Sequence, residues 1–301
     1  MERLWGGRKL ADLFGKDLPP DKRIGESWEI VDRPEAQSVV ANGPFKGKTL
    51  HELWSQHQKD IFGNFTAAPR FPLLIKLLDA QEKLSLQVHP PEKIAPTLGG
   101  EPKTECWYVA AAEPNAELFV GFKQAISRNE FESALRSRSA ADHVCTIKVK
   151  AGDAMFLQAG RLHAISAGTV LVEIQQNSDT TYRVFDWNRL DPATGKARPL
   201  HVDQALACID YSDVAPDLLR INGELLTRNK LFEIQKWDLA EMRQVTPVGQ
   251  FAIVCCLTGS VGCTDVNLRP GEFFLVPASL TDRDLRPRAD RTTLLRITVP
   301  N

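Results

Sequence analysis

Short runs in which apolar and polar residues alternate, or in which β-branched residues gather, recur along most of the chain. They include CTIKVK (145–150), TVLVEIQQ (169–176) and LLRITVP (294–300), and glycines and prolines separate them. Runs of this length and composition are typical of β-strands, and the glycines and prolines are typical of turns. The pattern predicts a protein that is mainly β.

Three segments have apolar residues near the i, i+3, i+4 spacing of an amphipathic helix instead. They are residues 48–58, 72–81 and 129–138. We expect a few helices added to a β framework.

A weak internal repeat links the two halves of the chain. One copy, GDAMFLQAGRLH, runs from Gly152 to His163, and the other, GEFFLVPASLTD, runs from Gly271 to Asp282. Each has a glycine, a strand-like apolar stretch, a turn, and a polar side chain at the twelfth position. Self-similarity of this kind predicts a duplicated fold.

The chain has 301 residues, which is enough for two domains. Residues 204–228 show no clear strand alternation, so we expect a linker there. The expected division is a first domain at 1–203, with the helical additions, and a second at 229–301.

Charge and apolar content narrow the function classes. The 37 Lys+Arg and 38 Asp+Glu give a net charge of -1, so no global field attracts nucleic acid or an anionic membrane. The start of the chain lacks the apolar stretch of a signal peptide, and the longest apolar runs are too short to span a bilayer. The six cysteines are dispersed without a CxxC pair, as is typical of reduced thiols. We expect a cytoplasmic protein with neither a nucleic-acid nor a membrane partner.

Two segments place polar side chains on one face of a strand. In LSLQVHP, Ser85, Gln87 and His89 alternate with apolar residues, and in PKTECWYVA, Lys103 and Glu105 share a face in the same way. Such a face either meets water or binds a ligand. The segments alone leave both interpretations open.

His163 adds a further candidate ligand. Together, His89, Glu105 and His163 form a set of two histidines and one carboxylate, which suits Zn²⁺ or Fe²⁺ with an open position for substrate. The alternative for His163 is a hydrogen-bonded histidine at a strand end, but the glycine-containing turn before it favours a ligand.

Arg183 stands out in the polar stretch EIQQNSDTTYRVFDWNR. A guanidinium can hold a phosphate or a developing oxyanion through paired hydrogen bonds. A structural ion pair with Asp179 or Asp186 is an equally good interpretation of the sequence.

The turn before His163 resembles the second motif of the cupin superfamily, Gly-x5-Pro-x-Gly-x2-His, with Gln158 in place of the proline. This resemblance implies two antiparallel β-barrels of jelly-roll type. The second barrel would lack a metal site, because Asp282 stands where the motif has histidine.

Longer blocks resemble the type I phosphomannose isomerases in their short bacterial form. The blocks are LWGG (4–7), IGESWE (24–29), LHELW (50–54), FPLLIKLLD (71–79), LSLQVHP (84–90), KTECWY (103–108), GRLHAI (160–165) and NSDTTYR (177–183). The resemblance implies that His89, Glu105 and His163 bind zinc, with Gln87 as a fourth ligand, directly or through water. It implies that Arg183 is the catalytic arginine.

The same resemblance places Lys103 beside the zinc ligands and Ser85 near a substrate phosphate. The implied activity is a zinc-dependent aldose–ketose isomerisation of mannose 6-phosphate and fructose 6-phosphate through a cis-enediol. Lys103 is the candidate acid or base, with a pKa lowered by neighbouring positive charge. Further candidate cations for the phosphate are Lys83, Lys93 and Arg161.

Two other hypotheses about the function remain: a metal-dependent oxygenase on the same barrel, and a phosphosugar-binding or sensory protein without turnover.

Overall fold

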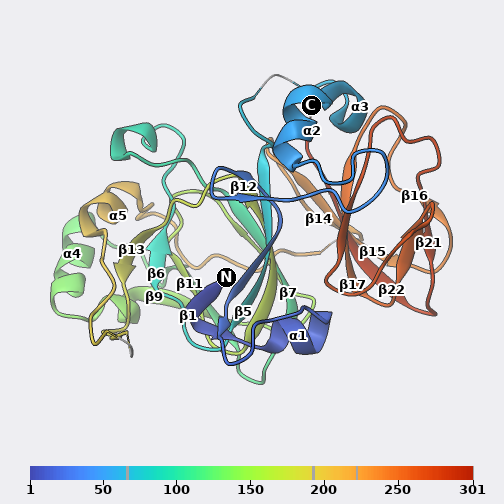
Figure 1. Cartoon of the computed structure of the whole chain (residues 1–301). Helices are drawn as coiled ribbons and strands as arrows, with labels where there is room; N and C mark the ends of the chain where they lie inside the picture. The colour runs from blue at the N-terminus through green and yellow to red at the C-terminus, as the bar shows by residue number, and fades with distance from the viewer. Residues whose placement is uncertain (66–67, 192–193, 222, 301) are drawn as a thin grey trace. The chain divides into compact units, whose positions relative to one another are not determined.

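The computed structural model describes residues 1–65, 68–191, 194–221 and 223–300 (Figure 1). Strands make up most of the regular structure in these ranges, and they pair antiparallel in both halves of the chain. The predicted mainly β fold is confirmed.

The chain forms two compact units that interleave in sequence. The first comprises Met1–Arg8, Pro20–Ser27 and Leu77–Leu218. The second comprises Lys9–Pro19, Trp28–Lys76 and the chain from Leu219 onward. This grouping differs from the consecutive division expected at residues 203 and 229, because packing joins segments that are distant in sequence. The expected linker also includes most of α5 (Val202–Cys208), which packs in the core of the first unit, and all of β14 (Leu225–Arg228).

Two five-stranded sheets carry the strands that position the candidate site. The first has the order β10 (Ala154–Leu157), β7 (Glu105–Ala112), β12 (Thr169–Gln176), β5 (Leu73–Ala80) and β2 (Glu26–Ile30). The second has the order β13 (Tyr182–Phe185), β6 (Leu86–Val88), β11 (His163–Ile165), β8 (Glu117–Phe122) and β9 (Val144–Lys148).

The strand β5 corrects one sequence expectation, since residues 72–81 were expected to form a helix. All eight residues of β5 are buried. A strand that is covered on both faces has no polar face and therefore shows no alternation. Its apolar residues, interrupted by Lys76 and Asp79, match helical spacing equally well, which is why the helix prediction was wrong.

The other two helix predictions are confirmed. The helix α2 (Leu50–Gln56) begins after Thr49 and α4 (Arg128–Arg136) begins after Ser127, and each has a capping box that satisfies backbone donors of the first turn. The remaining helices are α1 (Lys9–Phe14), α3 (Gln58–Phe62) and the short 3₁₀ segments η1 (Pro96–Leu98) and η2 (Ala140–His143).

The second unit contains a five-stranded and a four-stranded sheet. The first has the order β14, β15 (Glu233–Leu239), β22 (Thr292–Thr298), β17 (Ala252–Thr258) and β20 (Phe273–Val276). The second has the order β16 (Arg243–Gln244), β21 (Asp284–Pro287), β18 (Val261–Cys263) and β19 (Val266–Leu268). The orders 10-7-12-5-2 and 6-11-8-9 of the earlier sheets recur here as 20-17-22-15-14 and 16-21-18-19. This recurrence confirms the duplicated fold that the repeat predicted.

The turn at the end of the repeat differs between the copies. The strand β11 begins at His163 itself, whereas β21 begins at Asp284, two residues after Asp282. Asp282 lies in the longer turn and pairs with Arg286, with 3.0 Å between Oδ1 and Nη2. The twelfth positions of the two copies are therefore not structurally equivalent.

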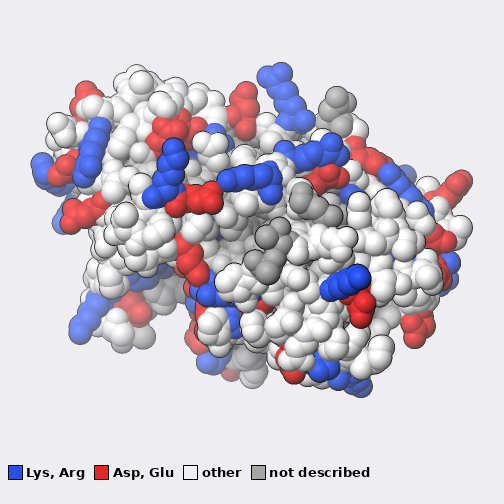
Figure 2. Space-filling view, turned by 90° about the horizontal axis from the view of Figure 1, so that it is seen from above, with Lys and Arg blue, Asp and Glu red and all other residues white. Residues whose placement is uncertain are grey.

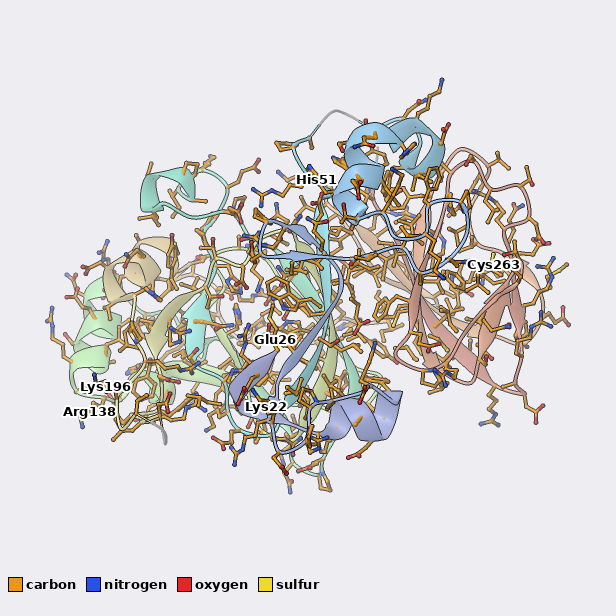
Figure 3. The ribbon with its side chains drawn as sticks, in the orientation of Figure 1. Lys22, Glu26, His51, Arg138, Lys196 and Cys263 are labelled. Carbon is orange, nitrogen blue, oxygen red and sulfur yellow. The ribbon has the colours of Figure 1, made fainter. Side chains whose placement is uncertain are left out.

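Short strands and surface pairs complete the fold. The chain starts with β1 (Glu2–Gly7), and β3 (Asp32–Arg33) pairs with β4 (Ala36–Gln37). Lys22 and Glu26, labelled in Figure 3, form ion pairs with Glu2 and Arg3 of β1. None of the six cysteines forms a disulfide in the described ranges, and five of them are buried. No helix among the described residues is long and apolar enough to cross a membrane.

Candidate metal centre and active site

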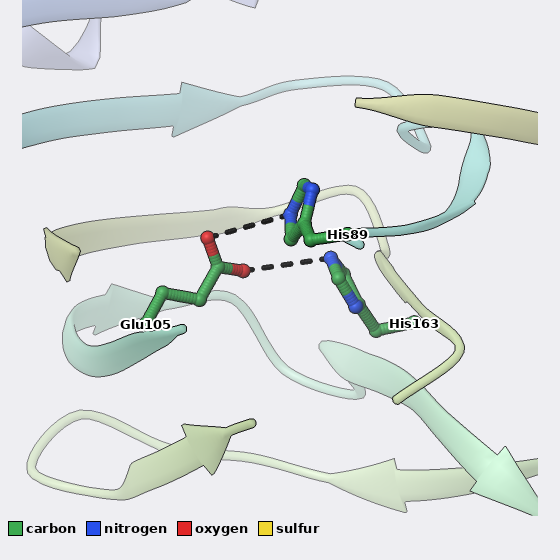
Figure 4. Close-up of side chains that lie close together, drawn as sticks. All are labelled: His89, Glu105 and His163. Atoms are coloured by element: carbon green, nitrogen blue, oxygen red, sulfur yellow. Dashed lines mark ion pairs between the residues drawn. The ribbon is translucent and has the colours of Figure 1, made fainter. Parts of the chain in front are cut away.

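Three candidate ligands from separate strands converge in the first unit (Figure 4). His89 follows β6, Glu105 starts β7 and His163 starts β11. Their ligand atoms all lie within 4.8 Å of one another. His89 Nε2 lies 3.5 Å from Glu105 Oε2, and His163 Nε2 lies 3.4 Å from Glu105 Oε1. Residues separated by up to 74 positions thus form one cluster.

Hydrogen bonds fix the direction in which both imidazoles face. His89 Nδ1 lies 2.9 Å from the Thr180 carbonyl oxygen, and His163 Nδ1 lies 2.9 Å from the Arg161 carbonyl oxygen. Because a carbonyl only accepts, each Nδ1 donates its proton and each Nε2 is unprotonated, with its lone pair available as an acceptor or a metal ligand. Burial lowers the pKa of both rings, that of His89 to about 3, so both are neutral near pH 7. This is the state in which histidine binds a metal.

The Glu105 carboxylate provides an independent test of whether a cation fits. The side chain is completely buried: Oε2 pairs with the Lys103 ammonium at 2.8 Å, and Oε1 has no hydrogen-bond donor among the described residues. Lys103 and the histidines lower the pKa of Glu105 well below its ordinary value despite burial, which alone would raise it. A buried carboxylate oxygen without a hydrogen bond is costly, and a metal ion beside Oε1 and the two imidazoles would satisfy it. The donor set therefore fits a divalent metal.

Lys103 lies among the same groups and is itself buried. Its Nζ is 2.8 Å from Glu105 Oε2, 3.6 Å from Glu173 Oε1 and 3.2 Å from His89 Nε2. Burial alone would lower the pKa of Lys103, but the two carboxylates outweigh it and raise the pKa. The protein's own groups therefore shift the pKa of Lys103 upward, which is opposite to the lowering that we expected from Arg183 and zinc. The ammonium group is held as a cation.

Glu173 is a site residue that the sequence analysis missed. It lies on β12 opposite Trp107, and the indole Nε1 of Trp107 donates to Glu173 Oε2 at 3.1 Å. Its side chain is buried beside Lys103, 70 positions away in sequence. A glutamate inside the apolar run TVLVEIQQ was the available signal, but its partner could not be found from the sequence.

A chain of polar contacts leads from the metal cluster to Arg183. The amide group of Gln87 lies 3.4 Å from His163 Nε2, and Ser85 Oγ lies 3.4 Å from Gln87 Oε1. Arg183 Nε donates to Ser85 Oγ at 3.3 Å. The antiparallel pairing of β13 with β6 aligns Arg183 with Gln87, which accounts for this proximity. The structure thus brings all seven predicted site residues into one region.

The structural alternative for Arg183 does not occur. Its guanidinium forms no ion pair with Asp179 or Asp186; it donates instead to Ser85 and, at 3.0 Å, to the Pro199 carbonyl oxygen. Among the described residues it has no carboxylate partner. A half-buried guanidinium without a counter-ion is suited to bind an anionic substrate group.

The three further phosphate candidates have different environments. Arg161 donates to both oxygens of Asp213 at 2.8 Å and is therefore already paired. Lys93 is exposed. Lys83 is half-buried, with its Nζ 4.2 Å from the ring centre of Trp187. Lys83 is the one of the three that lies in a defined, partly enclosed setting.

The duplicated β fold and the two-histidine, one-carboxylate cluster define a protein of the cupin class with a candidate metal site. Comparison with known proteins specifies it further. The family model for the catalytic domain of type I phosphomannose isomerase matches residues 1–103. A mannose-6-phosphate isomerase of Streptococcus mutans is 37% identical over 294 residues, covering 93% of this chain and 90% of that protein. The mannose-6-phosphate isomerase ManA of Bacillus subtilis is 35% identical over 303 residues, covering 96% and 94%.

A solved structure agrees with these relatives. The crystal structure of a mannose 6-phosphate isomerase from Bacillus subtilis matches with a TM-score of 0.86 and 35% identity, covering 99% of this chain and 97% of that one. The chain belongs to the type I phosphomannose isomerase family, as its sequence blocks predicted.

Proposed function

We propose that this chain is a zinc-dependent isomerase that interconverts mannose 6-phosphate and fructose 6-phosphate. Its relatives with 35 to 37% identity carry the name of this activity. The main observation behind the proposal is that a candidate metal cluster and a candidate anion-binding arginine lie in the same site. A cluster suited to a metal, formed by His89, Glu105 and His163, is linked through Gln87 and Ser85 to an arginine without a counter-ion.

Zinc is the metal that we assign to the cluster. His89 and His163 would hold it through Nε2 and Glu105 through its carboxylate, with Gln87 at the edge as a direct or water-bridged ligand. Two imidazoles and one carboxylate with an open position are a common catalytic zinc set. When bound, zinc supplies Lewis-acid stabilisation of negative charge on a substrate oxygen.

Arg183 and Ser85 would hold the sugar phosphate. Moving a proton between neighbouring carbons passes through an enediol whose negative charge is the main part of the barrier. Arg183 carries a fixed positive charge with donors left over beyond Ser85 and Pro199, so it can stabilise that charge or fix the substrate. Ser85 supplies a hydroxyl for the phosphate, and Lys83 is the nearby cation that best fits the same group.

Lys103 is the group that we assign to proton transfer. It holds its proton at Nζ between the carboxylates of Glu105 and Glu173. To act as a base, the Lys103 ammonium would first pass one proton to the Glu173 carboxylate, 3.6 Å away; the neutral amine would then take a proton from one substrate carbon and return it to the next, and Glu173 would finally give its proton back to Lys103. In its second role, the Lys103 ammonium balances the buried charge of Glu105.

We also propose that the enzyme acts in the cytoplasm on a small molecule. The unpaired thiols agree with a reducing compartment. On the face drawn in Figure 2, Lys and Arg are interspersed with Asp and Glu, which is unlike the broad basic surface of a nucleic-acid-binding protein.

The test is the formation of fructose 6-phosphate from mannose 6-phosphate by the purified protein, before chelation, after chelation, and after return of zinc. We expect turnover that chelation removes and zinc restores. Full turnover in metal-free protein would refute the metal assignment. Binding of mannose 6-phosphate by the zinc-loaded protein without turnover would favour a binding or sensory protein. Oxidation of the sugar by the Fe²⁺ form in oxygen would favour an oxygenase.

A further inference from the structure

A buried carboxylate lies three residues beyond Arg183, where β13 ends. Asp186 is 6% exposed and accepts hydrogen bonds from two arginines. Arg198 donates to both of its oxygens, from Nε at 2.7 Å and from Nη2 at 2.6 Å, and Arg189 donates from Nη2 at 2.7 Å. Bidentate arginine–carboxylate pairs fix geometry as well as charge. Asp186 thus anchors Arg198 rigidly to the end of β13.

The segment after Arg198 returns to Arg183. The Pro199 carbonyl accepts from Arg183 Nη1 at 3.0 Å. Arg183 and His201 are joined by two hydrogen bonds: the Arg183 backbone N–H donates to Nδ1 of the His201 ring at 3.2 Å, and the His201 backbone N–H donates to the Arg183 carbonyl at 2.7 Å. Residues 198–201 are therefore fixed at one end by Asp186 and at the other by Arg183. Between these ends, the Pro199 carbonyl holds the Arg183 guanidinium.

The backbone after Asp186 is strained in a way that serves this arrangement. Trp187 and Asn188 have φ angles of 55° and 54°, in the left-handed region, where a bulky side chain such as tryptophan is rare. The Trp187 ring is fixed by a hydrogen bond from Nε1 to the Leu84 carbonyl and by the nearby Lys83 ammonium. This turn reverses the chain sharply and allows Arg189 to reach back to Asp186.

The charges around Arg183 also require Asp186. Burial and the neighbouring Arg198 lower the pKa of Arg183, whereas Asp186 acts in the opposite direction. The two arginines that bind Asp186 hold its own pKa below the ordinary value despite burial. Without this carboxylate, three guanidinium groups would lie close together and repel one another.

We propose that Asp186 is a positioning residue for the isomerisation: it fixes residues 198–201 so that the Pro199 carbonyl directs the Arg183 guanidinium toward Ser85 and the substrate. The proposal rests on the proposed function, in which Arg183 acts on the sugar phosphate. It assigns to Asp186 no contact with substrate or metal.

The primary test is Asp186→Asn in the zinc-loaded enzyme, with mannose 6-phosphate as substrate. Asparagine keeps the shape but loses the charge and one acceptor. We expect kcat/KM to fall about 10- to 100-fold, because small displacements of a catalytic group have effects of this size. Zinc content should not change. The conservative change Arg198→Lys, which removes the bidentate pair from the other side, should lower kcat/KM in the same way.

A matched control comes from the second unit. Glu233 also lies between two arginines, Arg228 and Arg296. Glu233→Gln removes a comparable carboxylate and should leave kcat/KM unchanged. An equal loss in both variants would show a general effect of removing an ion pair and would overturn the proposal.

A double-mutant cycle separates positioning from a merely structural role. Asp186→Asn should have little further effect on kcat/KM in an Arg183→Lys background, since Arg183 is the group through which it acts. Multiplicative losses in the double variant, or wild-type kcat/KM in Asp186→Asn, would overturn the proposal. If Asp186→Asn is poorly folded, Arg198→Lys in the same background supplies the same test. If Arg183→Lys alone retains full activity, the role of Arg183 in the proposed function is wrong, and this outcome is distinct from failure of the Asp186 proposal.

Discussion

In the first unit, Glu105 pairs with Leu157 at the start of β7, and in the second unit Ala252 pairs with Val276 at the start of β17. The strand orders around these pairs are the same, so Ala252 occupies the position of Glu105, the proposed carboxylate ligand. The scaffold was duplicated, but the carboxylate of the candidate metal cluster is present in one copy of it. The same fold can therefore occur with or without a functional site, and the side chains that it carries decide which.

A second pair of equivalent positions shows the same difference. Glu173 lies opposite Trp107 in the first unit, and Arg296 lies opposite Val254 in the second. Where the first unit has a buried glutamate beside a lysine, the second has an arginine that donates to the Val245 carbonyl and pairs with Glu233. A cluster of buried apolar side chains surrounds Trp237 in the second unit. In the second unit this arginine stabilises the structure. In the first unit the glutamate at the equivalent position belongs to the candidate site.

The largest effect should come from making the first unit like the second. Glu105→Ala should abolish zinc binding and turnover, because it removes the ligand placed between His89 and His163. Zinc content by atomic absorption and the mannose 6-phosphate assay measure both. Zinc bound at full stoichiometry in this variant would mean that the histidines suffice and that Ala252 does not explain the second unit.

A smaller effect is expected where the second unit keeps a buried charge for structure. Arg283 is fully buried, and among the described residues it has no carboxylate partner. Its guanidinium donates to the backbone carbonyls of Thr246, Pro247, Gln250, Pro277, Ala278 and Leu280. It therefore joins two loops of the second unit by hydrogen bonds to their backbone.

Arg283→Met should lower the free energy of unfolding by about 3 kcal/mol or more, because several buried carbonyls lose their donor. Urea denaturation measures the loss, and Arg283→Lys should show part of it. Zinc content and kcat/KM of the folded fraction should be unchanged. A variant that loses zinc while remaining folded would contradict the division of roles between the units.

The third effect depends on pH. The two buried histidines of the described chain, His89 and His163, both lie in the first unit, and burial lowers the pKa of each. The folded chain resists protonation of His89 down to about pH 3, whereas the unfolded chain takes up that proton below about pH 6.5. Stability should therefore fall as pH decreases from 6.5, by about 1.4 kcal/mol per pH unit for His89 alone.

This dependence is measured by urea denaturation of chelated protein between pH 7 and pH 5. Carboxylates ordinarily titrate at about pH 4.5 and below, so above that pH the histidines account for most of the change in stability. His89→Gln should reduce the slope. An unchanged slope in that variant would show that His89 is not the group responsible.

Much of the site was predictable from the sequence, for physical reasons that particular residues illustrate. Ser85, Gln87 and His89 alternate with apolar residues along β6 and the positions on either side of it, so their common face followed from the strand period of two. Glu173 was not predicted, because its role depends on Lys103 and only the pairing of the strands brings the two residues together. The strand Leu73–Ala80 was mistaken for a helix because both of its faces are buried.

The interleaving of the two units along the sequence was not predicted, for a related reason. Residues 28–76 follow the start of the first unit directly in sequence, and no change of composition marks the crossing into the second. Breaks along the chain show where regular structure stops, whereas packing decides which segments belong together. Local pattern predicted strands and motifs, and it could not predict their long-range partners.

The smallest effect should come from the position that the repeat in the sequence makes most conspicuous. Asp282 aligns with His163 by sequence, but it lies in a turn that is two residues longer, half exposed, and paired with Arg286. Asp282→Ala should change the free energy of unfolding by no more than about 1 kcal/mol, as expected for an exposed ion pair. Zinc content and kcat/KM should stay at wild-type values. Loss of either in a folded Asp282→Ala variant would show that the second copy retains part of the function that Ala252 indicates it lacks.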